Sequence, residues 1–476
     1  MEEQEFVKDI TRMSDDFDRW YTDVVRKAEM ADYTPVKGCM VIRPYGYAIW
    51  EAIQRAFDDL IKSSGHQNWY FPLLIPEDIF LKEAEHVEGF NPQVAWVTRA
   101  GRSGDLDQPY VIRPTSETII GTIIRRYIQS HRDLPLLTNQ WCNVMRWEMR
   151  TRLFLRTSEF LWQEGHTFHA EEPEAREEVD LILGYYREVA EKWLAMPVLA
   201  GQKTDTEKFA GGVYTLSIEA LMRDGLALQA GTSHYLGQNF TRAYDITYTD
   251  RSNEKQLCHS TSWGISTRLV GGVIMAHGDD TGLILPPKVA RIQVAVVPIR
   301  GDDPKVSEFV NELEARHRRE GVRIHVDRRD ERPGEKFNHW ELKGVPLRLE
   351  VGPRDVEAGQ VTLVDRLTRQ KRQLPAAAPL GGELEHFQQA LFDRAAQFLA
   401  DNTFEMDTLE ELKAHFAERN GVVWAPWCGS AECEARVKDE TGGVSSRNFD
   451  PNQKPSGVCL VDGKPARYRV AWAKAY

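Results

Sequence analysis

The chain has 476 residues, 42% of them hydrophobic, and its formal net charge at pH 7 is −12. This length exceeds what one hydrophobic core usually holds, and the apolar content excludes a disordered chain, so two or three folded domains are expected. The acidic balance disfavours binding to nucleic acid through overall charge, and no apolar run reaches membrane-spanning length.

The first residues, MEEQEFVKDITRMSDDFDRWY, are acidic and amphipathic, unlike a secretory signal or an organelle transit peptide. Six cysteines in a chain of this size do not indicate a disulfide framework. We therefore expect a cytoplasmic protein that does not associate with membranes.

The first unit, residues 1–289, mixes helical and strand patterns. A helix is predicted at 45–63, closed by Gly65, followed by a strand at 69–76 and a second helix at 116–131. The expected fold of this unit is α+β.

The stretch RWEMRTRLFLRTSEFLWQEGHTFHA, residues 146–170, predicts an antiparallel hairpin, because side chains two apart on a strand share a face. One face of this hairpin, called the loaded face below, carries charged, aromatic and histidine side chains. The other side carries Trp147, Met149, Leu161 and Thr167, with Glu159 and Gln163 as exceptions to the apolar pattern, and is expected to pack against apolar neighbours. The alternative is a surface hairpin with ordinary ion pairs. The loaded face carries Arg146, Glu148, Arg150, Arg156, Phe160, Trp162, Glu164, His166 and Phe168.

The second unit, residues 290–403, alternates strand and helix patterns: RIQVAVVPI, VSEFVNELEARHRREG, VRIHVD, PGEKFNHWELKG and VPLRLEVG. This rhythm predicts a small α/β domain with right-handed crossovers, and a last helix is expected at 383–400. The unit has 19 basic and 19 acidic residues, with basic clusters at 316–323, 328–332 and 366–372. Such clusters are usually solvated surface, and they leave nucleic-acid binding open. Residues 404–476 form a small α+β unit with three of the cysteines.

Several arginines on a hairpin, in a chain without a P-loop motif, are typical of a site that holds a triphosphate through guanidinium groups. A carboxylate and an aromatic ring on the same face are suited to a nucleobase, and Glu164 could accept from an ammonium group. ATP and an amine-bearing substrate are therefore the expected ligands.

The sequence also resembles a known family. RWE with RTSEFLWQEGHT resembles motif 2 of class II aminoacyl-tRNA synthetases, and STSWGISTRLVGGVIMAHGDD, residues 260–280, resembles their motif 3. RPTSET, KFAGGVY, QAGTSHYLGQNF and ELKGVPLRLEVGP are similar to prolyl-tRNA synthetases of the archaeal and eukaryotic type. The resemblance implies activation of L-proline with ATP and transfer to tRNA(Pro), with Mg²⁺ on the phosphates.

The resemblance also implies roles for single residues. Arg146 would hold the α-phosphate and the substrate carboxylate, and Arg268 the γ-phosphate; these two are the expected catalytic residues. The other expected ATP-binding residues are Glu148, Arg156, Thr157, Phe160, Gln229, Thr232 and Ser266.

For proline, the resemblance implies that Thr115 and Glu117 bind the imino group, although both would also stabilise the start of a helix. Trp162, Glu164, His166 and His234 would line the pocket, although a lone His or Trp is more often part of a core. The residue types alone do not indicate proline.

The second unit resembles the family's anticodon-binding domain, which makes Glu341 and Arg348 candidate readers of the anticodon. The alternative function is a non-catalytic relative that binds tRNA or regulates another enzyme. Such relatives usually lack the phosphate-binding arginines or the anticodon domain, and this chain has both.

Three further expectations follow from the resemblance. His169 and Ser260 are 91 positions apart, and the bacterial-type editing domain has no room between them, so hydrolysis of alanyl-tRNA(Pro) is not expected. The helix 45–63 and FPLLIP resemble motif 1, the family's interface element, so a homodimer is expected. Tyr476 matches a family ending that reaches back toward the active site, although a terminal tyrosine is often merely docked.

The third unit contains a candidate metal site. Family members commonly bind a structural zinc with four cysteines, and this chain offers Cys428, Cys433 and Cys459, with Asp462 in the fourth position. Three thiolates and a carboxylate are able to form a tetrahedral zinc site. The competing interpretation is that the chain no longer binds zinc here and that the cysteines are simply buried side chains of the hydrophobic core.

Overall fold

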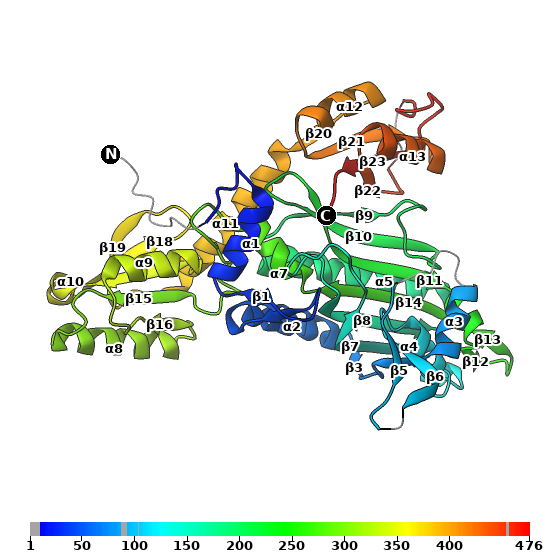
Figure 1. Ribbon diagram of the computed structural model, residues 1–476, viewed down its shortest axis with the longest axis horizontal. Helices are drawn as coiled ribbons and strands as arrows, with labels where there is room; N and C mark the ends of the chain where they lie inside the picture. The colour runs from blue at the N-terminus through cyan, green and yellow to red at the C-terminus, as the bar shows by residue number, and fades with distance from the viewer. Residues whose placement is uncertain (1–9, 87–92, 103, 454–456) are drawn as a thin grey trace.

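The computed structural model describes residues 10–86, 93–102, 104–453 and 457–476. An 11-stranded sheet forms its centre (Figure 1). The order across this sheet is β20 (Thr403–Glu405), β21 (Val422–Trp427), β23 (Tyr468–Ala473), β22 (Ser445–Phe449), β9 (Val198–Gln202), β10 (Tyr214–Leu221), β11 (Ala227–Gly237), β14 (His259–Ser266), β8 (Glu159–His169), β7 (Leu136–Met145) and β3 (Gln67–Asn68). From β21 to β7 neighbouring strands are antiparallel.

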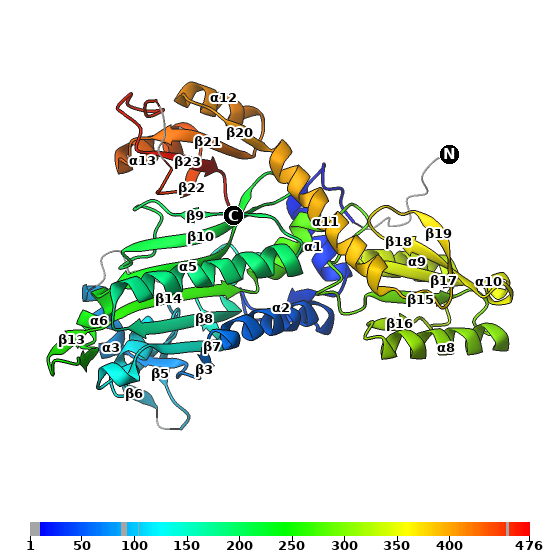
Figure 2. The ribbon, with the colours of Figure 1, turned by 180° about the vertical axis from the view of Figure 1, so that it is seen from behind.

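Two long helices cover one face of this sheet (Figure 2). They are α2 (Pro44–Ser63), which confirms the predicted first helix, and α5 (Glu172–Glu188). Phe57 of α2 stacks on Tyr186 of α5 with ring centroids 5.0 Å apart, and Trp263 of β14 lies against Phe57. A Cβ atom at Gly165 of β8 would lie 2.1 Å from the Trp263 ring, so only glycine allows this packing beside the loaded face.

The second and third predicted elements are shorter than the sequence pattern indicates. Only β4 (Leu74–Pro76) forms within 69–76, because the preceding backbone is bonded by side chains: Phe71 N–H donates to Gln140 and its carbonyl accepts from Arg113. The helix predicted at 116–131 ends early as α4 (Glu117–Ile124). The carboxylate of Asp133 accepts from the backbone of residues 129 and 130 and draws the chain into a new turn there.

The remaining elements of the first unit surround this framework. Within the described residues, no helix is long and apolar enough to cross a membrane. These elements are α1 (Phe17–Lys27), β1 (Ala31–Tyr33), β2 (Met40–Ile42), α3 (Glu77–His86), β5 (Trp96–Arg99), β6 (Asp105–Ile112), η1 (His131–Asp133), η2 (Val189–Trp193), α6 (Asn239–Ala243), β12 (Thr247–Thr249), β13 (Lys255–Leu257) and α7 (Arg268–His277).

The predicted β-α-β-α-β unit is confirmed, with β15 (Val294–Pro298) between β16 (Ile324–Val326) and β17 (Leu347–Val351), all parallel. Two further antiparallel strands complete a five-stranded sheet, β18 (Gln360–Asp365) and β19 (Lys371–Pro375). Its helices are α8 (Pro304–Arg319), α9 (Pro333–Leu342), α10 (Pro353–Ala358) and α11 (Gly381–Asp401).

The C-terminal part adds α12 (Leu409–Glu418) and α13 (Ala431–Glu440) to strands β20 to β23. Its sheet is continuous with the central sheet, because Phe449 of β22 pairs with Gln202 of β9. The third unit therefore extends the central sheet beyond β9 (Figure 1).

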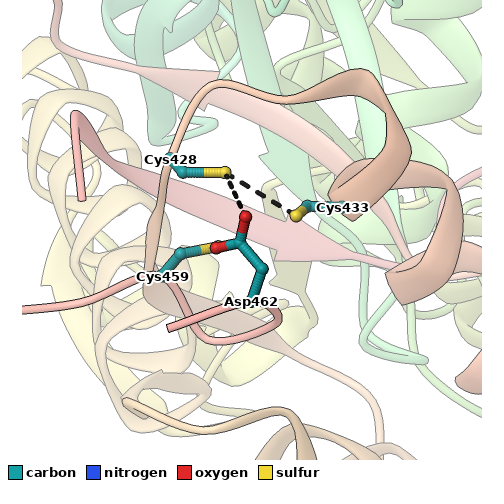
Figure 3. Close-up of side chains that lie close together, drawn as sticks. All are labelled: Cys428, Cys433, Cys459 and Asp462. Carbon is teal, nitrogen blue, oxygen red and sulfur yellow. Dashed lines mark hydrogen bonds between the residues drawn. The ribbon is translucent and has the colours of Figure 1, made fainter. Parts of the chain in front are cut away.

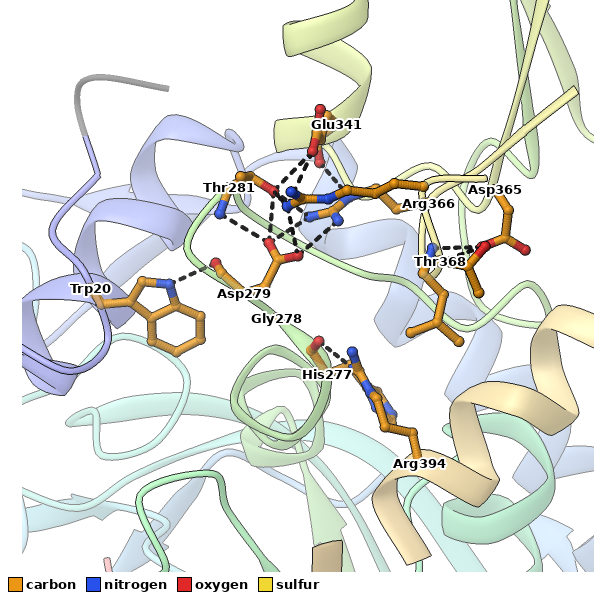
Figure 4. A network of polar contacts seen from close by, with 12 residues as sticks. Trp20, His277, Gly278, Asp279, Thr281, Glu341, Asp365, Arg366, Thr368 and Arg394 are labelled. Carbon is orange, nitrogen blue, oxygen red and sulfur yellow. Dashed lines mark hydrogen bonds and ion pairs between the residues drawn. The ribbon is translucent and has the colours of Figure 1, made fainter. Parts of the chain in front are cut away.

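A polar network joins the five-stranded unit to the end of α7 (Figure 4). Asp279 accepts two bonds from the buried Arg366 guanidinium, at 2.7 and 2.9 Å, and Arg394 of α11 donates to the carbonyl of His277. Arg366 belongs to the basic cluster 366–372, which lies at the turn between β18 and β19. Arg366 therefore stabilises the contact between the two units and is not part of a solvated surface.

Candidate active site

The predicted hairpin forms, but its first arm ends earlier than the alternation indicates. β7 and β8 pair from Leu136 with Phe168 to Met145 with Glu159, and residues 146–158 form a loop. Trp147 and Met149 were predicted to pack and are instead 47% and 68% exposed. The prediction failed there because Met145 is the last paired residue, and beyond it the backbone no longer alternates.

The second arm behaves as predicted. Phe160, Trp162, Glu164 and His166 of β8 all line one cavity of about 300 Å³. The opposite face of the strand points to α5, where Gln163 accepts from the Tyr186 hydroxyl at 2.8 Å. Glutamine was an exception in the apolar pattern, and this buried hydrogen bond explains it.

Every residue expected to bind ATP or proline lines this same cavity, although they come from five separate segments of the chain. Arg150 and Phe168, the other members of the predicted face, do not: Arg150 is exposed and Phe168 is buried in a neighbouring hydrophobic cluster. The cavity residues are Thr115, Glu117, Arg146, Glu148, Arg156, Thr157, Phe160, Trp162, Glu164, His166, Gln229, Thr232, His234, Ser266 and Arg268.

Two buried acids lie close together in the cavity. Glu117, the first residue of α4, accepts from the Thr115 hydroxyl, and its other oxygen lies 3.4 Å from His166 Nε2. Burial raises the pKa of Glu117, but His166 and Thr115 outweigh this and bring it to about 2. Glu117 is therefore an anion at neutral pH, although only 7% of it is exposed.

Glu164 is the second buried acid. One oxygen accepts from Ser116 and from the Gln140 amide, while the other is buried and has no hydrogen-bond partner among the described residues. Burial raises the pKa of Glu164, and the charge of Glu117 raises it further. Two carboxylates and His166 thus converge within 4.8 Å, an arrangement suited to a small cation such as an ammonium group.

His234 of β11 also lines the cavity. Its Nδ1 bonds the Thr215 hydroxyl at 2.8 Å, and its ring lies 4.7 Å from that of Phe209. Burial lowers the pKa of His234 to about 4, so the ring is neutral at physiological pH.

Arginines also line the cavity. The Arg146 guanidinium lies 5.6 Å from the Phe160 ring centre and 5.3 Å from that of Trp162, and its Nε donates to the carbonyl of Pro114. Arg268 is the first residue of α7, and its backbone N–H donates to the Ser266 hydroxyl. A cation at a helix N-terminus adds to the positive end of the helix dipole, which favours an anion there.

The tip of the loop carries an ion pair. Arg156 Nε donates to Glu148 at 2.8 Å, and 59% of the Arg156 side chain is exposed. Glu148 is in turn oriented by a bond from its backbone N–H to the Ser158 hydroxyl. Because the ion pair is exposed to solvent, Arg156 is able to leave Glu148 and bind an anionic ligand instead.

Sequence reasoning assigned no role to several residues that also line the cavity: Lys203, Glu207, Lys208, Phe209 and Thr215. Two of them, Lys208 and Phe209, belong to KFAGGVY, a segment whose resemblance to the family does not by itself indicate the role of each residue. Lys203 has no signal in the local sequence, because its environment depends on how β9 pairs with β10 and with β22.

The two candidate anticodon residues lie in the second unit. Glu341, near the end of α9, accepts from the Thr281 hydroxyl at 3.1 Å within the network of Figure 4. Arg348 of β17 pairs with Glu350, and its guanidinium lies 4.4 Å from the Phe337 ring centre. The structure therefore places Glu341 at a contact between units and Arg348 on the sheet.

The four candidate metal ligands converge as the sequence predicts (Figure 3). Their ligand atoms all lie within 4.8 Å of one another; Cys428 Sγ is 3.6 Å from Cys433 Sγ and 3.8 Å from Asp462 Oδ2. Burial and the neighbouring thiols raise the pKa of Cys433 to about 12. The donor set fits zinc, a cation that deprotonates thiols on binding.

Tyr476 docks beside the loop of residues 146–158. Its hydroxyl donates to Asp224, and its ring lies 5.1 Å from the Arg152 guanidinium. Tyr476 itself does not line the cavity described above.

Comparison with known proteins agrees with this geometry. Residues 100–277 match the model of the tRNA synthetase class II core domain (G, H, P, S and T). Residues 293–378 match the anticodon binding domain, and 409–476 the C-terminal domain of prolyl-tRNA synthetase. The antiparallel sheet and its cationic cavity thus define a class II aminoacyl-tRNA synthetase.

Individual relatives narrow the assignment. The chain is 53% identical to the proline–tRNA ligase of Symbiobacterium thermophilum over the full length of both, and 50% identical to proline–tRNA ligase 2 of Clostridioides difficile over 100% of this chain and 99% of that one. The crystal structure of prolyl-tRNA synthetase from Cryptosporidium parvum, complexed with halofuginone and AMPPNP, matches with a TM-score of 0.94 and 41% identity over 98% of this chain and 99% of that one. The chain belongs to the prolyl-tRNA synthetase family.

Proposed function

We propose that this proline–tRNA ligase activates L-proline with ATP in the cavity of the central sheet and then transfers it to tRNA(Pro). The observation that carries the proposal is that one cavity holds both kinds of charge, the buried carboxylates of Glu117 and Glu164 and the guanidinium groups of Arg146 and Arg268. A cationic imino group and an anionic triphosphate would each meet complementary charge.

In this proposal proline binds beside the two buried carboxylates. Glu117 and Thr115 accept from and orient the imino group, while the unpartnered oxygen of Glu164 accepts a second bond. Trp162, His166 and His234 form the walls, and the neutral His234 ring adds no repulsion.

ATP occupies the other part of the cavity. Phe160 would stack the adenine, Glu148 would accept from its amino group, and Arg156 would turn from Glu148 to the outer phosphates. Arg268, at the start of α7, would hold the γ-phosphate, with Ser266 positioning its backbone. Gln229, Thr232 and Thr157 complete the nucleotide site, and Mg²⁺ would bridge phosphate oxygens.

Catalysis then requires orientation and charge stabilisation rather than a covalent enzyme nucleophile. Arg146 would bind both the proline carboxylate and the α-phosphate, so that the carboxylate oxygen attacks phosphorus in line and pyrophosphate leaves. The terminal hydroxyl of tRNA next attacks the carbonyl of the adenylate, and AMP leaves.

The decisive experiment is proline-dependent exchange of pyrophosphate into ATP by the purified protein. Exchange that depends on added proline is the expected result. A protein that binds tRNA(Pro) but shows no exchange would instead be a non-catalytic relative, and the proposal would be withdrawn.

The units have distinct proposed roles. Residues 1–289 form the catalytic domain, 290–403 the anticodon-binding domain and 404–476 the C-terminal domain. Arg348 remains a candidate anticodon reader; Glu341 would have to leave Thr281 to contact a base. We further propose that the enzyme acts in the cytoplasm.

The enzyme is also proposed to be of the archaeal and eukaryotic type and to lack the bacterial editing insertion. The interval from His169 to Ser260 contains α5, β9, β10 and β11, which are parts of the central fold and its cover. On this basis alanyl-tRNA(Pro) is not hydrolysed in cis.

A homodimer is proposed because α2 and the FPLLIP segment resemble motif 1. Tyr47 and Leu74, on these two segments, are exposed hydrophobic residues, as an interface on this side would require.

We propose that Cys428, Cys433, Cys459 and Asp462 hold a structural zinc ion. Their convergence from a strand end, a helix and a turn supports this, since cysteines that are simply side chains of the core would not require a carboxylate in the group. Lys464 lies 3.1 Å from Asp462 and competes with the metal for it, which makes this site weaker than four thiolates. Zinc would tie these segments together and takes no part in the chemistry.

A further inference from the structure

A buried ion cluster links the C-terminal strands to the wall of the cavity. Arg447 of β22 donates to Glu219 of β10 at 2.9 Å, and Lys203 Nζ, directly after β9, lies 3.3 Å from the other oxygen of Glu219. The side chains of Lys203, Glu219 and Arg447 are only 3%, 2% and 8% exposed. Lys203 and Glu219 lie on or next to consecutive paired strands, whereas Arg447 comes from the C-terminal part of the chain, and the three meet where β22 adjoins β9.

In the cluster two cations share the carboxylate of Glu219, and Glu207, which also lines the cavity, adds a second negative charge that acts on Lys203. Burial lowers the pKa of both Lys203 and Arg268, and the carboxylate of Glu219 acts in the opposite direction on each. Lys203 and Arg268 both line the cavity, so the electrostatic influence of Glu219 reaches both at the same site. Because Lys203 lines the same cavity as Arg146 and Arg268, the three cations together favour a polyphosphate there.

The backbone of Lys203 is held from both sides. Its N–H donates to the carbonyl of Thr215 at 2.9 Å, while the next residue, Thr204, bonds through its hydroxyl to Glu434 of α13 at 2.8 Å and to Ser446 of β22 at 2.9 Å. The C-terminal domain therefore orders the segment that presents Lys203 to the cavity, as well as supplying Arg447.

We propose that Lys203 is a further binding residue for the phosphate groups of ATP and pyrophosphate, and that Arg447 of the C-terminal domain positions it through Glu219. Arg447 engages one carboxylate oxygen and prevents Glu219 from pairing with Lys203 alone. An ammonium group has three N–H donors, and Glu219 accepts from one, so the others are available to phosphate oxygens. The inference rests on the proposed function, since it requires ATP in this cavity.

The test compares the full-length protein with Lys203→Met, Lys203→Arg and Arg447→Met in proline-dependent pyrophosphate exchange. Lys413→Met is the matched control, because Lys413 lies on the surface of α12 and pairs with Glu410. We expect Lys203→Met to raise the KM for ATP and for pyrophosphate about tenfold, the loss of one charged contact, and the KM for proline less than about twofold. Lys203→Arg should restore most of this loss, and Arg447→Met should raise the KM for ATP about three- to tenfold.

Several outcomes would overturn the proposal. An unchanged KM for ATP in Lys203→Met would do so, and so would an equal rise in the KM for proline, which indicates a general structural defect. A rise confined to the KM for tRNA in aminoacylation would assign Lys203 to tRNA phosphates and also refute it. If Arg447→Met does not fold, the two Lys203 variants decide. Absence of exchange by the unmodified protein would instead refute the proposed function.

Discussion

The contact between Asp279 and Arg366 offers a quantitative test of how the anticodon-binding domain is joined to the catalytic domain. Arg366 donates to both oxygens of Asp279, to the carbonyl of Glu341 and to the hydroxyl of Thr281, and its side chain is only 4% exposed. Arg366→Met removes all of these bonds while preserving much of the volume. We expect it to loosen the contact between the two domains.

The magnitude follows from what remains around Asp279. Removing one partner of a buried ion pair costs about 3–5 kcal/mol. Asp279 is 24% exposed and keeps the N–H and hydroxyl of Thr281, so the lower limit, about 3 kcal/mol, applies. Arg369→Met is the control: Arg369 is 52% exposed and lies 3.5 Å from Asp279, so its loss should cost less than about 1 kcal/mol.

Hydrogen exchange measures this cost locally, because a chain of several domains does not unfold in two states. The amides of Leu283 and Leu285 donate across the contact to the carbonyls of Leu342 and Gly344. In Arg366→Met these amides should exchange about a hundredfold faster, the equivalent of about 3 kcal/mol. Unchanged exchange, or an equal effect in Arg369→Met, would refute the reasoning.

The pH dependence adds a second criterion. Burial raises the pKa of Asp279, but the bonds from Arg366 and Thr281 outweigh this and lower it below its ordinary value. A carboxyl whose pKa is lowered by folding stabilises the folded state above the ordinary pKa, and this contribution is lost as the pH falls through the lowered value. The difference between the protein and Arg366→Met should be constant above about pH 5 and shrink below about pH 4.

Four further predictions concern the site and the assembly. Glu117→Gln should lower kcat/KM for proline about a hundredfold while changing the KM for ATP less than about threefold, whereas Glu172→Gln on the surface of α5 should change neither; equal effects on both substrates would contradict the assignment. Elemental analysis of protein purified without added metal should find close to one zinc per chain and less in Asp462→Ala, and a metal-free, stable and fully active protein would exclude the site. Purified enzyme should leave alanyl-tRNA(Pro) intact over the time in which it charges tRNA with proline; its hydrolysis would show an editing activity. Sedimentation at micromolar concentration should give a dimer, and a purely monomeric species would count against the interface at α2.

Local sequence patterns correctly predicted those parts of the site whose residues all lie on a single helix or strand. The alternation along β8 placed Trp162, Glu164 and His166 on one face, because strand geometry alone imposes that period. It failed for Trp147 and Met149, since a strand continues only while a neighbour pairs with its backbone, and the sequence does not show where the partner ends. The strand at 69–76 was overestimated for a related reason: side chains of Gln140 and Arg113 satisfy that backbone.

By itself the sequence determined the class of elements, the loaded face of the hairpin and the motifs whose resemblance indicated the family. The tertiary structure alone decided which charges meet. Glu117 reaches His166 only because α4 begins beside β8. Lys203 reaches Glu219 because β9 pairs with β10, and Arg447 joins them only because the C-terminal strands extend the central sheet. The physical reason is that hydrophobic periodicity is a local property of the chain, whereas the energy of a buried charge depends on groups that only folding brings within a few ångströms.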